Sequence, residues 1–267
     1  MSHIKGFFLQ SRISAQYSAL LNQHQLANFE QLWGFEGDWF EPPNRERGGW
    51  SGVNFIELAH ESGEKLGVYL KRQQNFMRRT WLHPVAGEPT FVREFNILQH
   101  LGKHNINVPK MIFFATQANQ ALLMTEALAG YVSCDRWLLE NKQASLKRKK
   151  MLINNIATAV KKMHQAGVQH RSLYAKHLFV KENDNFFEVA LIDFEKSRVT
   201  PFIAWLKLSD LITLSRRMPQ ISHAHKLLFI KKYLGVTRLN FWQKWFCMYL
   251  AHKSKHKSLQ NISPKKT

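Results

Sequence analysis

The chain has 267 residues, 45% of them hydrophobic and 21% charged, a balance that suits a folded protein and excludes global disorder. Its two cysteines, Cys134 and Cys247, argue against a disulfide scaffold and cannot form a four-ligand zinc site alone, so we expect a reducing cytosol. No apolar run reaches the ~18 residues of a membrane-spanning helix, and the first residues do not resemble a signal peptide.

The net charge of +19 is confined to the second half of the chain. Residues 1–140 hold 13 basic and 13 acidic side chains, whereas residues 141–267 hold 25 basic and 6 acidic ones. Such a surplus favours a polyanionic partner, which is a nucleic acid, an anionic membrane surface or a phosphorylated ligand. The charge does not choose among the three.

The first half is predicted to be rich in strands. Apolar residues between 14 and 33 predict one or two short helices, and a polar stretch with prolines follows from 38 to 47. A helix is predicted from about residue 90 to residue 101. Strands are predicted at 53–58, 66–71, 111–115 and 121–125.

The second half is predicted to be helical. One hairpin interrupts it, with strands at 178–181 and 186–192 around a polar turn. Helical spacing of apolar residues predicts helices at 147–165, 203–217, 222–234 and 239–252. A strand-rich half followed by a helix-rich half predicts an α+β fold with a cleft between two lobes.

A glycine-rich segment precedes the first long predicted strand. Gly48, Gly49 and Gly52, together with Ser51, would let the backbone approach a phosphate and point N–H groups at it. The segment is not a Walker A loop, because no Gly-Lys-Ser/Thr follows. A glycine-rich hairpin turn without a ligand accounts for the same residues, so both interpretations stay open.

A lysine and a glutamate have the spacing of a nucleotide-binding ion pair. Lys71 ends a predicted strand, where a lone lysine is usually a solvated edge residue. Glu94, however, falls inside the apolar stripe of a predicted helix, between Phe91 and Leu98, and a carboxylate facing a core needs a cationic partner. Protein kinases hold ATP phosphates with such a lysine and glutamate. Arg93 is the alternative partner for Glu94.

The second half contains a third element of the same pattern. The helix at 147–165 runs into HQAGVQHRSLYAKHLFV, and VALIDFE follows. This is the layout of a kinase catalytic loop, a hairpin and a metal-binding Asp-Phe pair, in the kinase order after the glycine loop, the strand lysine and the helix glutamate. Asp193, at the end of an apolar strand, is well placed to hold Mg²⁺ on the nucleotide phosphates.

Four longer blocks make the resemblance specific. RERGGWSGV, LKRQQN, HPxxGEPTFxRE and HRSLYxKHxFV are similar to the lipopolysaccharide core kinase family, the Kdo/heptose kinases, and mostly to its InaA-type branch, over roughly residues 29–216. The resemblance implies a protein-kinase-like bilobal fold, with a strand-rich N-lobe and a helical C-lobe. It also implies ATP, Mg²⁺, and phosphoryl transfer to a lipopolysaccharide inner-core sugar, Kdo or heptose, at the cytoplasmic face of the membrane.

The same resemblance assigns domains and roles. The expected parts are an N-terminal helical extension (1–40), an N-lobe (41–126), a C-lobe (127–252) and a basic, disordered tail (253–267). Glu126 takes the place where the kinase hinge meets adenine, and Asp210 resembles the helix aspartate that supports the catalytic loop. The nucleotide-binding set is Gly48, Gly49, Ser51, Gly52, Lys71 and Glu126, the catalytic set is Asp193, Lys71, Glu94, Ser172 and Lys176, and the metal set is Asp193 and His177.

Two positions depart from the kinase pattern. Ser172 follows His170 and Arg171 where an aspartate would accept the proton of the acceptor hydroxyl, and a neutral hydroxyl is no base near pH 7. His177 stands where protein kinases have a metal-binding asparagine, although the lipopolysaccharide kinases resemble this sequence there, and imidazole is a poor ligand for Mg²⁺. Lys176 is either a γ-phosphate contact, which would offset part of the loss, or a surface lysine.

Two hypotheses follow. The first is an ATP-dependent kinase that acts on core lipopolysaccharide or Kdo-lipid A, peripheral to the cytoplasmic side of the inner membrane, where the basic helical half faces an anionic leaflet. The second is a pseudokinase, which binds nucleotide but serves as a regulatory or scaffold module, and Ser172 favours it. Nucleic-acid binding rests on charge alone, without a zinc finger or an aromatic RNA-binding signature.

Overall fold

The computed structural model describes residues 10–46, 48–78, 87–200, 204–216, 218 and 221–260, and the chain forms two compact units. The first unit comprises residues 1–100 and 109–129, and the second comprises residues 101–108 and 130–267. Each unit has fully buried apolar side chains of its own, such as Leu70 in the first and Leu152 in the second.

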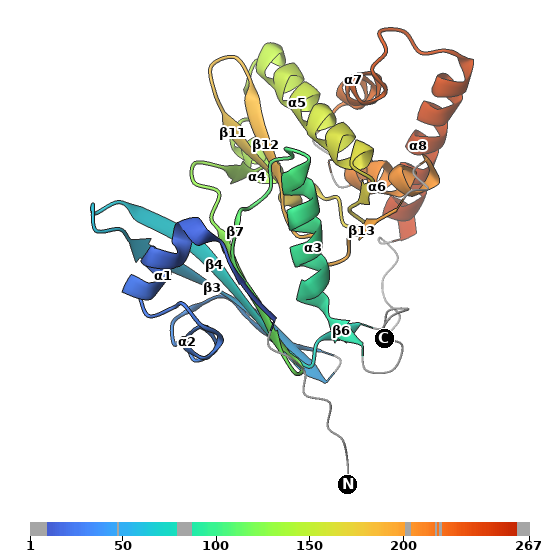
Figure 1. Ribbon diagram of the computed structural model, residues 1–267. Coiled ribbons are helices and arrows are strands. Elements are labelled where there is room, and N and C mark those ends of the chain that lie inside the picture. The colour runs from blue at the N-terminus through green and yellow to red at the C-terminus, as the bar shows by residue number, and fades with distance from the viewer. Residues whose placement is uncertain are drawn as a thin grey trace. The chain divides into compact units, whose positions relative to one another are not determined.

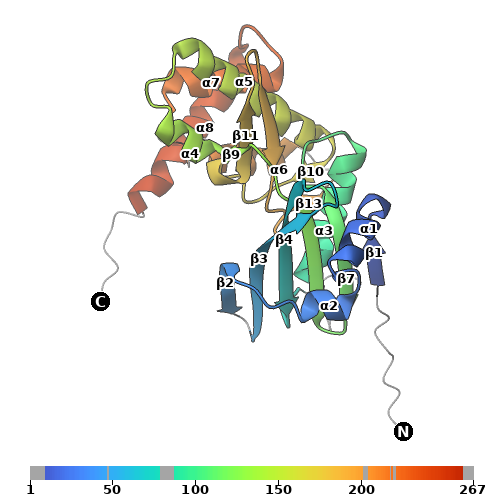
Figure 2. The same cartoon turned by 90° about the vertical axis from the view of Figure 1, so that its left-hand side faces the viewer.

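The first unit is built on a six-stranded antiparallel sheet with the strand order β1-β7-β8-β4-β3-β2 (Figure 2). The strands are β1 (Gln10–Ile13), β2 (Trp39–Glu46), β3 (Gly49–Ala59), β4 (Lys65–Gln74), β7 (Met111–Gln117) and β8 (Gln120–Glu126). Four of them contain the predicted strands, so the strand-rich first half is confirmed. A separate pair joins β5 (Met77–Arg78) to β6 (Glu88–Pro89).

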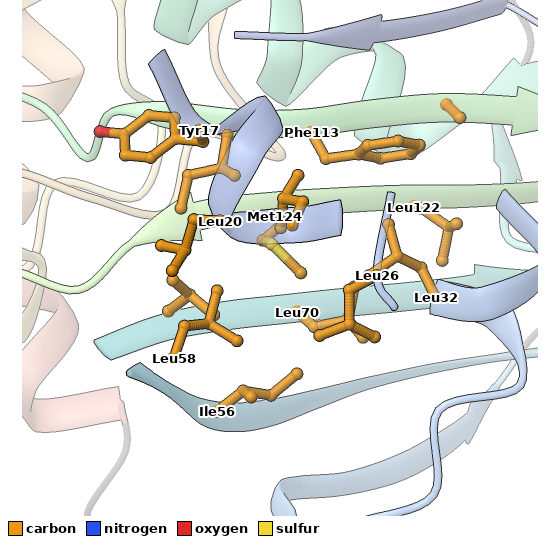
Figure 3. Packing of buried hydrophobic residues seen from close by; sticks show 14 of the residues in the cluster. Tyr17, Leu20, Leu26, Leu32, Ile56, Leu58, Leu70, Phe113, Leu122 and Met124 are labelled. Carbon is orange, nitrogen blue, oxygen red and sulfur yellow. The ribbon is translucent and has the colours of Figure 1, made fainter. Parts of the chain in front are cut away.

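One face of this sheet is covered by the N-terminal segment, as the predicted short helices required. The segment contains a 3-10 turn (Ala15–Tyr17), α1 (Ser18–Gln23) and α2 (Phe29–Trp33). Leu20, Leu26 and Leu32 from it meet Leu70 and Met124 of the sheet in one hydrophobic cluster (Figure 3). Burial of this apolar surface makes residues 15–33 part of the sheet's own core.

Helix α3 (Thr90–Lys103) packs on the face of the sheet opposite the N-terminal cluster. Successive strand residues face opposite sides, so Phe113 joins the N-terminal cluster while Phe114 stacks on Phe95 of α3, with ring centroids 4.0 Å apart. The hydroxyl of Thr90 donates to Gln73 Oε1 at 2.8 Å, which ties the first turn of α3 to β4.

Strand β2 occupies the stretch that the sequence indicated only as polar and rich in proline. It pairs with β3 alone, and its register shifts between Trp39 and Glu41 and again between Glu41 and Asn44. Pro42 and Pro43 lie within these irregular steps, at the edge of the sheet, where a missing N–H donor removes no bond to a further strand. The prolines prevented the prediction of this strand, although a strand at the edge of a sheet can contain them.

The second unit is mainly helical, as predicted (Figure 1). Its helices are α4 (Cys134–Glu140), α5 (Leu146–Gln165), α6 (Ala204–Arg216), α7 (His223–Leu234) and α8 (Phe241–Gln260). Its hairpin consists of β11 (Leu178–Glu182) and β12 (Phe187–Leu191), and β9 (Val132–Ser133) adds a third strand. Helix α7 packs on α5, and α8 packs on α6. None of the helices in the described ranges is long and apolar enough to cross a membrane.

Helix α4 begins at Cys134, with Ser133 as its N-cap residue and Asp135 in its first turn. The end of one helix differs from its expected position. Helix α8 continues to Gln260, into the stretch for which the sequence predicted a tail. Residues 261–267 of that tail lie outside the described residues, as do His83 and Pro84 of the third resemblance block.

Candidate functional site

In the first unit, Lys71 and Glu94 form the predicted ion pair. Lys71 Nζ lies 2.7 Å from Glu94 Oε1, and the two side chains are 20% and 3% exposed. Lys71 reaches α3 because it follows Leu70 in β4, and alternation turns it to the side opposite the N-terminal cluster. The second carboxylate oxygen, Glu94 Oε2, is buried and has no hydrogen-bond partner. A carboxylate buried to this degree depends on its lysine.

The glycine-rich segment covers Gly48, just before β3, and the first residues of β3 itself. Gly48 has a φ of +77°, a conformation that favours glycine, and a Cβ on Gly49 would collide with the backbone carbonyl of Gln74. A Cβ on Gly52 would lie 2.6 Å from the ring of Trp39. Backbone geometry and packing therefore account for all three glycines, and Ser51 pairs within the sheet. A phosphate-binding role for this segment stays a prediction.

Glu126, at the end of β8, is held by contacts that the sequence did not indicate. Its Oε2 atom accepts a hydrogen bond of 3.0 Å from the hydroxyl of Tyr17 and lies 3.4 Å from Lys110 Nζ. Its backbone N–H donates to the carbonyl of Lys110. Burial, followed by the bond to Glu126, raises the pKa of Tyr17 to about 12. The N-terminal segment thus fixes the residue at the expected hinge.

In the second unit, Asp210 of α6 supports the His-Arg loop, as the resemblance implied. Its buried carboxylate accepts hydrogen bonds from the backbone N–H groups of His170 (2.7 Å) and Arg171 (2.8 Å). Arg171 adopts a φ of +65°, which costs a non-glycine residue about 1 kcal/mol. The two charge-assisted bonds to Asp210 offset that strain and hold the loop.

Two further residues complete this support, and neither was predicted from the sequence. His164, near the end of α5, lies with its Nε2 atom 3.2 Å from Asp210 Oδ2. Its other ring nitrogen lies 2.8 Å from the hydroxyl of Tyr233 in α7. Burial and the charge of Asp210 raise the pKa of Tyr233. The only signal in the sequence was that a histidine follows Val160 at helical spacing in an apolar stripe. That position is equally typical of an ordinary core residue.

His170 is a structural residue of the loop. Its Nε2 atom lies 3.0 Å from the carbonyl oxygen of Ile192, so this nitrogen carries the proton, and Nδ1 is buried without a partner. Burial lowers the pKa of His170 and keeps the ring neutral. Ser197 donates its hydroxyl to the carbonyl of His170, and Phe194 packs against the ring. The loop and the Asp-Phe segment are thereby joined.

His177 connects the loop to Asp193. Its Nδ1 atom lies 2.8 Å from the carbonyl oxygen of Ser172 and therefore carries a proton, while its Nε2 atom lies 3.2 Å from Asp193 Oδ2. A carboxylate oxygen also only accepts, so a proton or a cation between the two groups would stabilise this contact. Asp193 is 38% exposed and has a φ of +64°. Both predicted metal ligands thus lie together.

Ser172 and Lys176 have different surroundings. Ser172 is buried, and its carbonyl accepts from the backbone N–H of Tyr174 as well as from His177. Lys176 is exposed in the 3-10 turn (Ala175–His177), one residue before His177. Ser172, His177 and Asp193 are therefore connected through one chain of contacts, while Lys71, Glu94 and the glycine-rich segment belong to the other unit.

Comparison with known proteins identifies the family. Residues 30–233 match the model of the lipopolysaccharide kinase (Kdo/WaaP) family. The chain belongs to this family. It is 35% identical to protein InaA of Escherichia coli K12 over 176 residues, which are 64% of this chain and 78% of InaA. It is 27% identical to the lipopolysaccharide core heptose(I) kinase WaaP of the same strain, over 43% of this chain and 47% of WaaP.

A solved structure of WaaP in complex with acyl carrier protein has the same fold as this family member. The TM-score is 0.69 at 17% sequence identity, over 95% of this chain and all of that one. The expected α+β, protein-kinase-like fold, with a strand-rich lobe and a helical lobe, is confirmed. Family membership supports a kinase role, and kinases use ATP, generally with a divalent metal.

The residues of the candidate site fit a magnesium ion held largely by phosphates. The described residues contain no group of three or more acidic, histidine or cysteine side chains that could hold a metal. Mg²⁺ does not need such a cage, because it is commonly bound by one or two carboxylates together with substrate phosphates and water. Asp193 supplies one partly exposed carboxylate. His177 suits hard Mg²⁺ less well.

The helical unit also contains an apolar cavity that the sequence did not reveal. It has a volume of about 410 Å³ and is lined mainly by α6, α7 and α8, with apolar side chains that include Leu211, Leu214, Phe229 and Leu250. Its polar lining residues are Ser215, Arg216, His223 and Lys226. Burial lowers the pKa of Lys226, whose Nζ donates to the carbonyl of Ser215 at 2.7 Å.

Proposed function

We propose that this family kinase binds ATP with Mg²⁺ and transfers the γ-phosphate to a hydroxyl of a lipopolysaccharide inner-core sugar, Kdo or heptose. The observation that carries the nucleotide half of the proposal is the buried Lys71–Glu94 pair, 2.7 Å between Nζ and Oε1. The ammonium, oriented by Glu94, would neutralise nucleotide phosphates, and Asp193 would hold the metal. Bound Mg²⁺ would neutralise charge that develops on the transferred phosphoryl group.

Catalysis without a base at Ser172 agrees with the chemistry of phosphoryl transfer. The transition state is loose, and the reaction depends mainly on positioning and charge neutralisation, so the protein supplies orientation and cations. General base catalysis contributes about 10²–10⁴-fold, which is the expected deficit relative to a kinase with an aspartate at this position. Lys176 offsets part of the deficit by stabilising charge on the γ-phosphate.

The second candidate is a pseudokinase, and Ser172 is the observation that favours it. In that case the protein binds Mg-ATP through Lys71, Glu94 and Asp193 and acts as a regulatory module. Both candidates place the protein at the cytoplasmic face of the inner membrane, with core lipopolysaccharide or Kdo-lipid A as the phosphorylated partner and the basic helical unit facing the anionic leaflet.

The helical unit has a further proposed partner. The similar WaaP structure contains acyl carrier protein, and the cavity of about 410 Å³ in this chain has the apolar lining that an acyl chain requires. We propose that an acylated acyl carrier protein binds this unit. It should raise the melting temperature, whereas unacylated carrier protein should not. An equal effect of both forms would contradict a role for the cavity.

The deciding experiment measures transfer of the γ-phosphate of ATP to purified core lipopolysaccharide by wild type and Asp193→Ala. Transfer that is lost in the variant establishes the enzyme. An inactive wild type that binds Mg-ATP, with binding abolished by Lys71→Ala, establishes the pseudokinase. If neither transfer nor nucleotide binding occurs, both candidates are wrong.

A further inference from the structure

Helix α8 carries an exposed aromatic surface that neither proposed activity uses. Phe241, Trp242 and Met248 are 73%, 74% and 68% exposed, the three highest values for large apolar side chains in the described part of the chain, and Trp245 is 55% exposed. At 3.6 residues per turn, these four side chains fall on one side of the helix. We call Phe241, Trp242, Trp245 and Met248 the α8 outer face.

The opposite side of α8 is anchored in the helical unit. Leu250 is buried, and Cys247, Leu250 and Ala251 line the apolar cavity together with α6 and α7. The helix therefore has an apolar side for the protein core and a second apolar side that faces solvent. Exposed apolar patches of this kind mark interaction sites in soluble domains.

The charge around the outer face has one sign. No aspartate or glutamate follows Asp210, so the last 57 residues contain 12 Lys and Arg and no acidic side chain. With about 100° per residue, Lys244 falls on one flank of the outer face and Lys253 on the other. Both lysines are exposed, and Lys253 Nζ lies 5.7 Å from the ring centroid of Tyr249. Aromatic rings flanked by lysines therefore form the surface.

We infer that the α8 outer face is a docking surface for an anionic lipid bilayer, with the aromatic side chains at the level of the headgroups. Tryptophan is enriched at membrane interfaces, because one end of its ring is apolar and the other donates a hydrogen bond. Long lysine side chains on the flanks can reach anionic headgroups while their aliphatic stems lie along apolar surface. Each Lys or Arg near such a surface adds attraction.

Two other occupants fit the observations less well. A second copy of this chain would bring two strongly basic surfaces together, and like charges repel. A protein partner would favour a defined set of ion pairs, whereas here the cations are spread over the helix and the following seven residues. A fluid anionic surface accepts such a spread. The inference rests on the proposed function only for its biological setting, since a lipopolysaccharide acceptor lies in a bilayer.

The test is co-sedimentation of the full-length protein with vesicles of phosphatidylcholine alone or with 30% phosphatidylglycerol. The disrupting variant is Phe241→Ser/Trp242→Ser/Trp245→Ser, whose changed side chains are exposed and leave the packed side intact. The matched control is Phe186→Ser, which removes an aromatic ring that is 47% exposed in the β11–β12 turn. A third variant, Lys244→Glu/Lys253→Glu, reverses the two flanking charges.

Wild type and Phe186→Ser should bind the anionic vesicles equally. The aromatic variant should bind at least about tenfold more weakly, the charge variant should lose most of its preference for anionic lipid, and 0.5 M salt should weaken wild-type binding. If the aromatic variant binds anionic vesicles as strongly as wild type does, the inference is wrong. So does concentration-dependent dimerisation that only the aromatic variant abolishes, or binding to acyl carrier protein through this face with no vesicle binding.

These results are independent of the proposed phosphoryl transfer. Transfer to detergent-dispersed lipopolysaccharide by a protein that ignores vesicles would refute the docking surface and leave the kinase intact. Vesicle binding that depends on the α8 outer face, in a protein without transferase activity, would establish the surface and refute the kinase. Binding of Mg-ATP by the aromatic variant, equal to that of wild type, confirms that the substitutions leave the fold in place.

Discussion

His177 and Asp193 face each other at 3.2 Å, while the other ring nitrogen of His177 lies 2.8 Å from the carbonyl oxygen of Ser172. The imidazole therefore ties the expected metal ligand to the residue that replaces the expected base. Asp193 is also held in a left-handed backbone conformation, with a φ of +64°. The carboxylate is thus oriented before a metal arrives, which reduces the ordering that metal binding requires.

The first prediction concerns this carboxylate. Asp193→Asn keeps the size of the side chain and a possible contact with His177 but removes the charge that attracts Mg²⁺. The affinity for ATP in the presence of Mg²⁺ should fall by about 10- to 100-fold, while the affinity for ATP without metal should stay within twofold. Titration calorimetry with and without Mg²⁺ measures both values. A metal dependence that persists in the variant would refute the metal site.

The second prediction uses the unequal burial of Lys71 and Glu94. Lys71→Met leaves a carboxylate that is 3% exposed without its lysine, whereas Glu94→Leu leaves an ammonium that is 20% exposed and can reach water. Lys71→Met should therefore lower the free energy of unfolding by about 3 kcal/mol and Glu94→Leu by about 1 kcal/mol. The double variant should recover most of the loss, because no buried charge remains.

Urea unfolding of the four proteins measures this cycle. Lys65→Met is the matched control, since Lys65 pairs with Glu57 at 3.2 Å, where both side chains are more than half exposed. Its effect should lie within about 0.5 kcal/mol of zero. Additive losses in the double variant would mean that the two side chains do not depend on each other.

The third prediction concerns Tyr17 and alkaline pH. Tyr17→Phe removes the hydroxyl that donates to Glu126 and should lower the free energy of unfolding by about 1 kcal/mol at pH 8. The folded-state pKa of Tyr17, about 12, lies above its ordinary value of 10. The stabilisation by the hydroxyl is therefore fully present below pH 10 and is lost as the pH rises toward 12.

The difference between wild type and Tyr17→Phe should accordingly shrink between pH 10 and pH 11, as followed by chemical denaturation at each pH. Titrations shared by both proteins cancel in this difference. A constant difference across the range would mean that the hydroxyl of Tyr17 is not bound to Glu126.

The fourth prediction concerns Asp210. Asp210→Ala leaves the backbone N–H groups of His170 and Arg171 without their acceptor, although the loop conformation at Arg171 requires them to be held. The free energy of unfolding should fall by about 3 kcal/mol. Asp210→Asn, which retains one acceptor oxygen, should lose less. Arg171→Gly should restore part of the loss in Asp210→Ala, because glycine accepts a positive φ. No rescue would contradict the strain argument.

Local patterns in the sequence were sufficient to predict the elements that carry the site. Lys71 and Glu94 were predicted to pair because Glu94 is a charged residue inside the apolar stripe of a predicted helix and needs a cation. Lys71, at the end of a predicted strand, has the spacing from Glu94 that protein kinases show. Asp193 was visible at the end of an apolar strand. The helices of the second unit followed from spacing of 3.6 residues, and their predicted bounds differ from the observed ones mostly at the ends.

Contacts between distant segments could not be predicted in this way. Tyr17 and Glu126 are 109 positions apart, and His164 and Tyr233 are 69 apart, so no local period relates them. The strand at 39–46 was not predicted, because its prolines and charges interrupt the alternation of apolar and polar residues that indicates a strand. An edge strand can form without that alternation. Likewise, the apolar residues of the buried side and of the outer face of α8 alternate along the chain, so the sequence does not show which of them are buried. The packing of α8 on α6 shows which side is buried.

The last prediction addresses the position of the missing base. Ser172→Asp places a carboxylate where the kinase pattern has its proton acceptor, on a loop that Asp210 already holds in place. If the protein is a kinase that lacks only the base, the rate of transfer to core lipopolysaccharide should rise by about 10²–10⁴-fold, with little change in the Michaelis constant for ATP. Ser172→Asn, similar in size but without a base, should give no such gain. Asp193→Asn in the Ser172→Asp background should abolish it, because positioning of the phosphates is required first. A Ser172→Asp protein that folds and binds Mg-ATP but transfers no phosphate would show that more than the base is absent, and would leave the pseudokinase as the function.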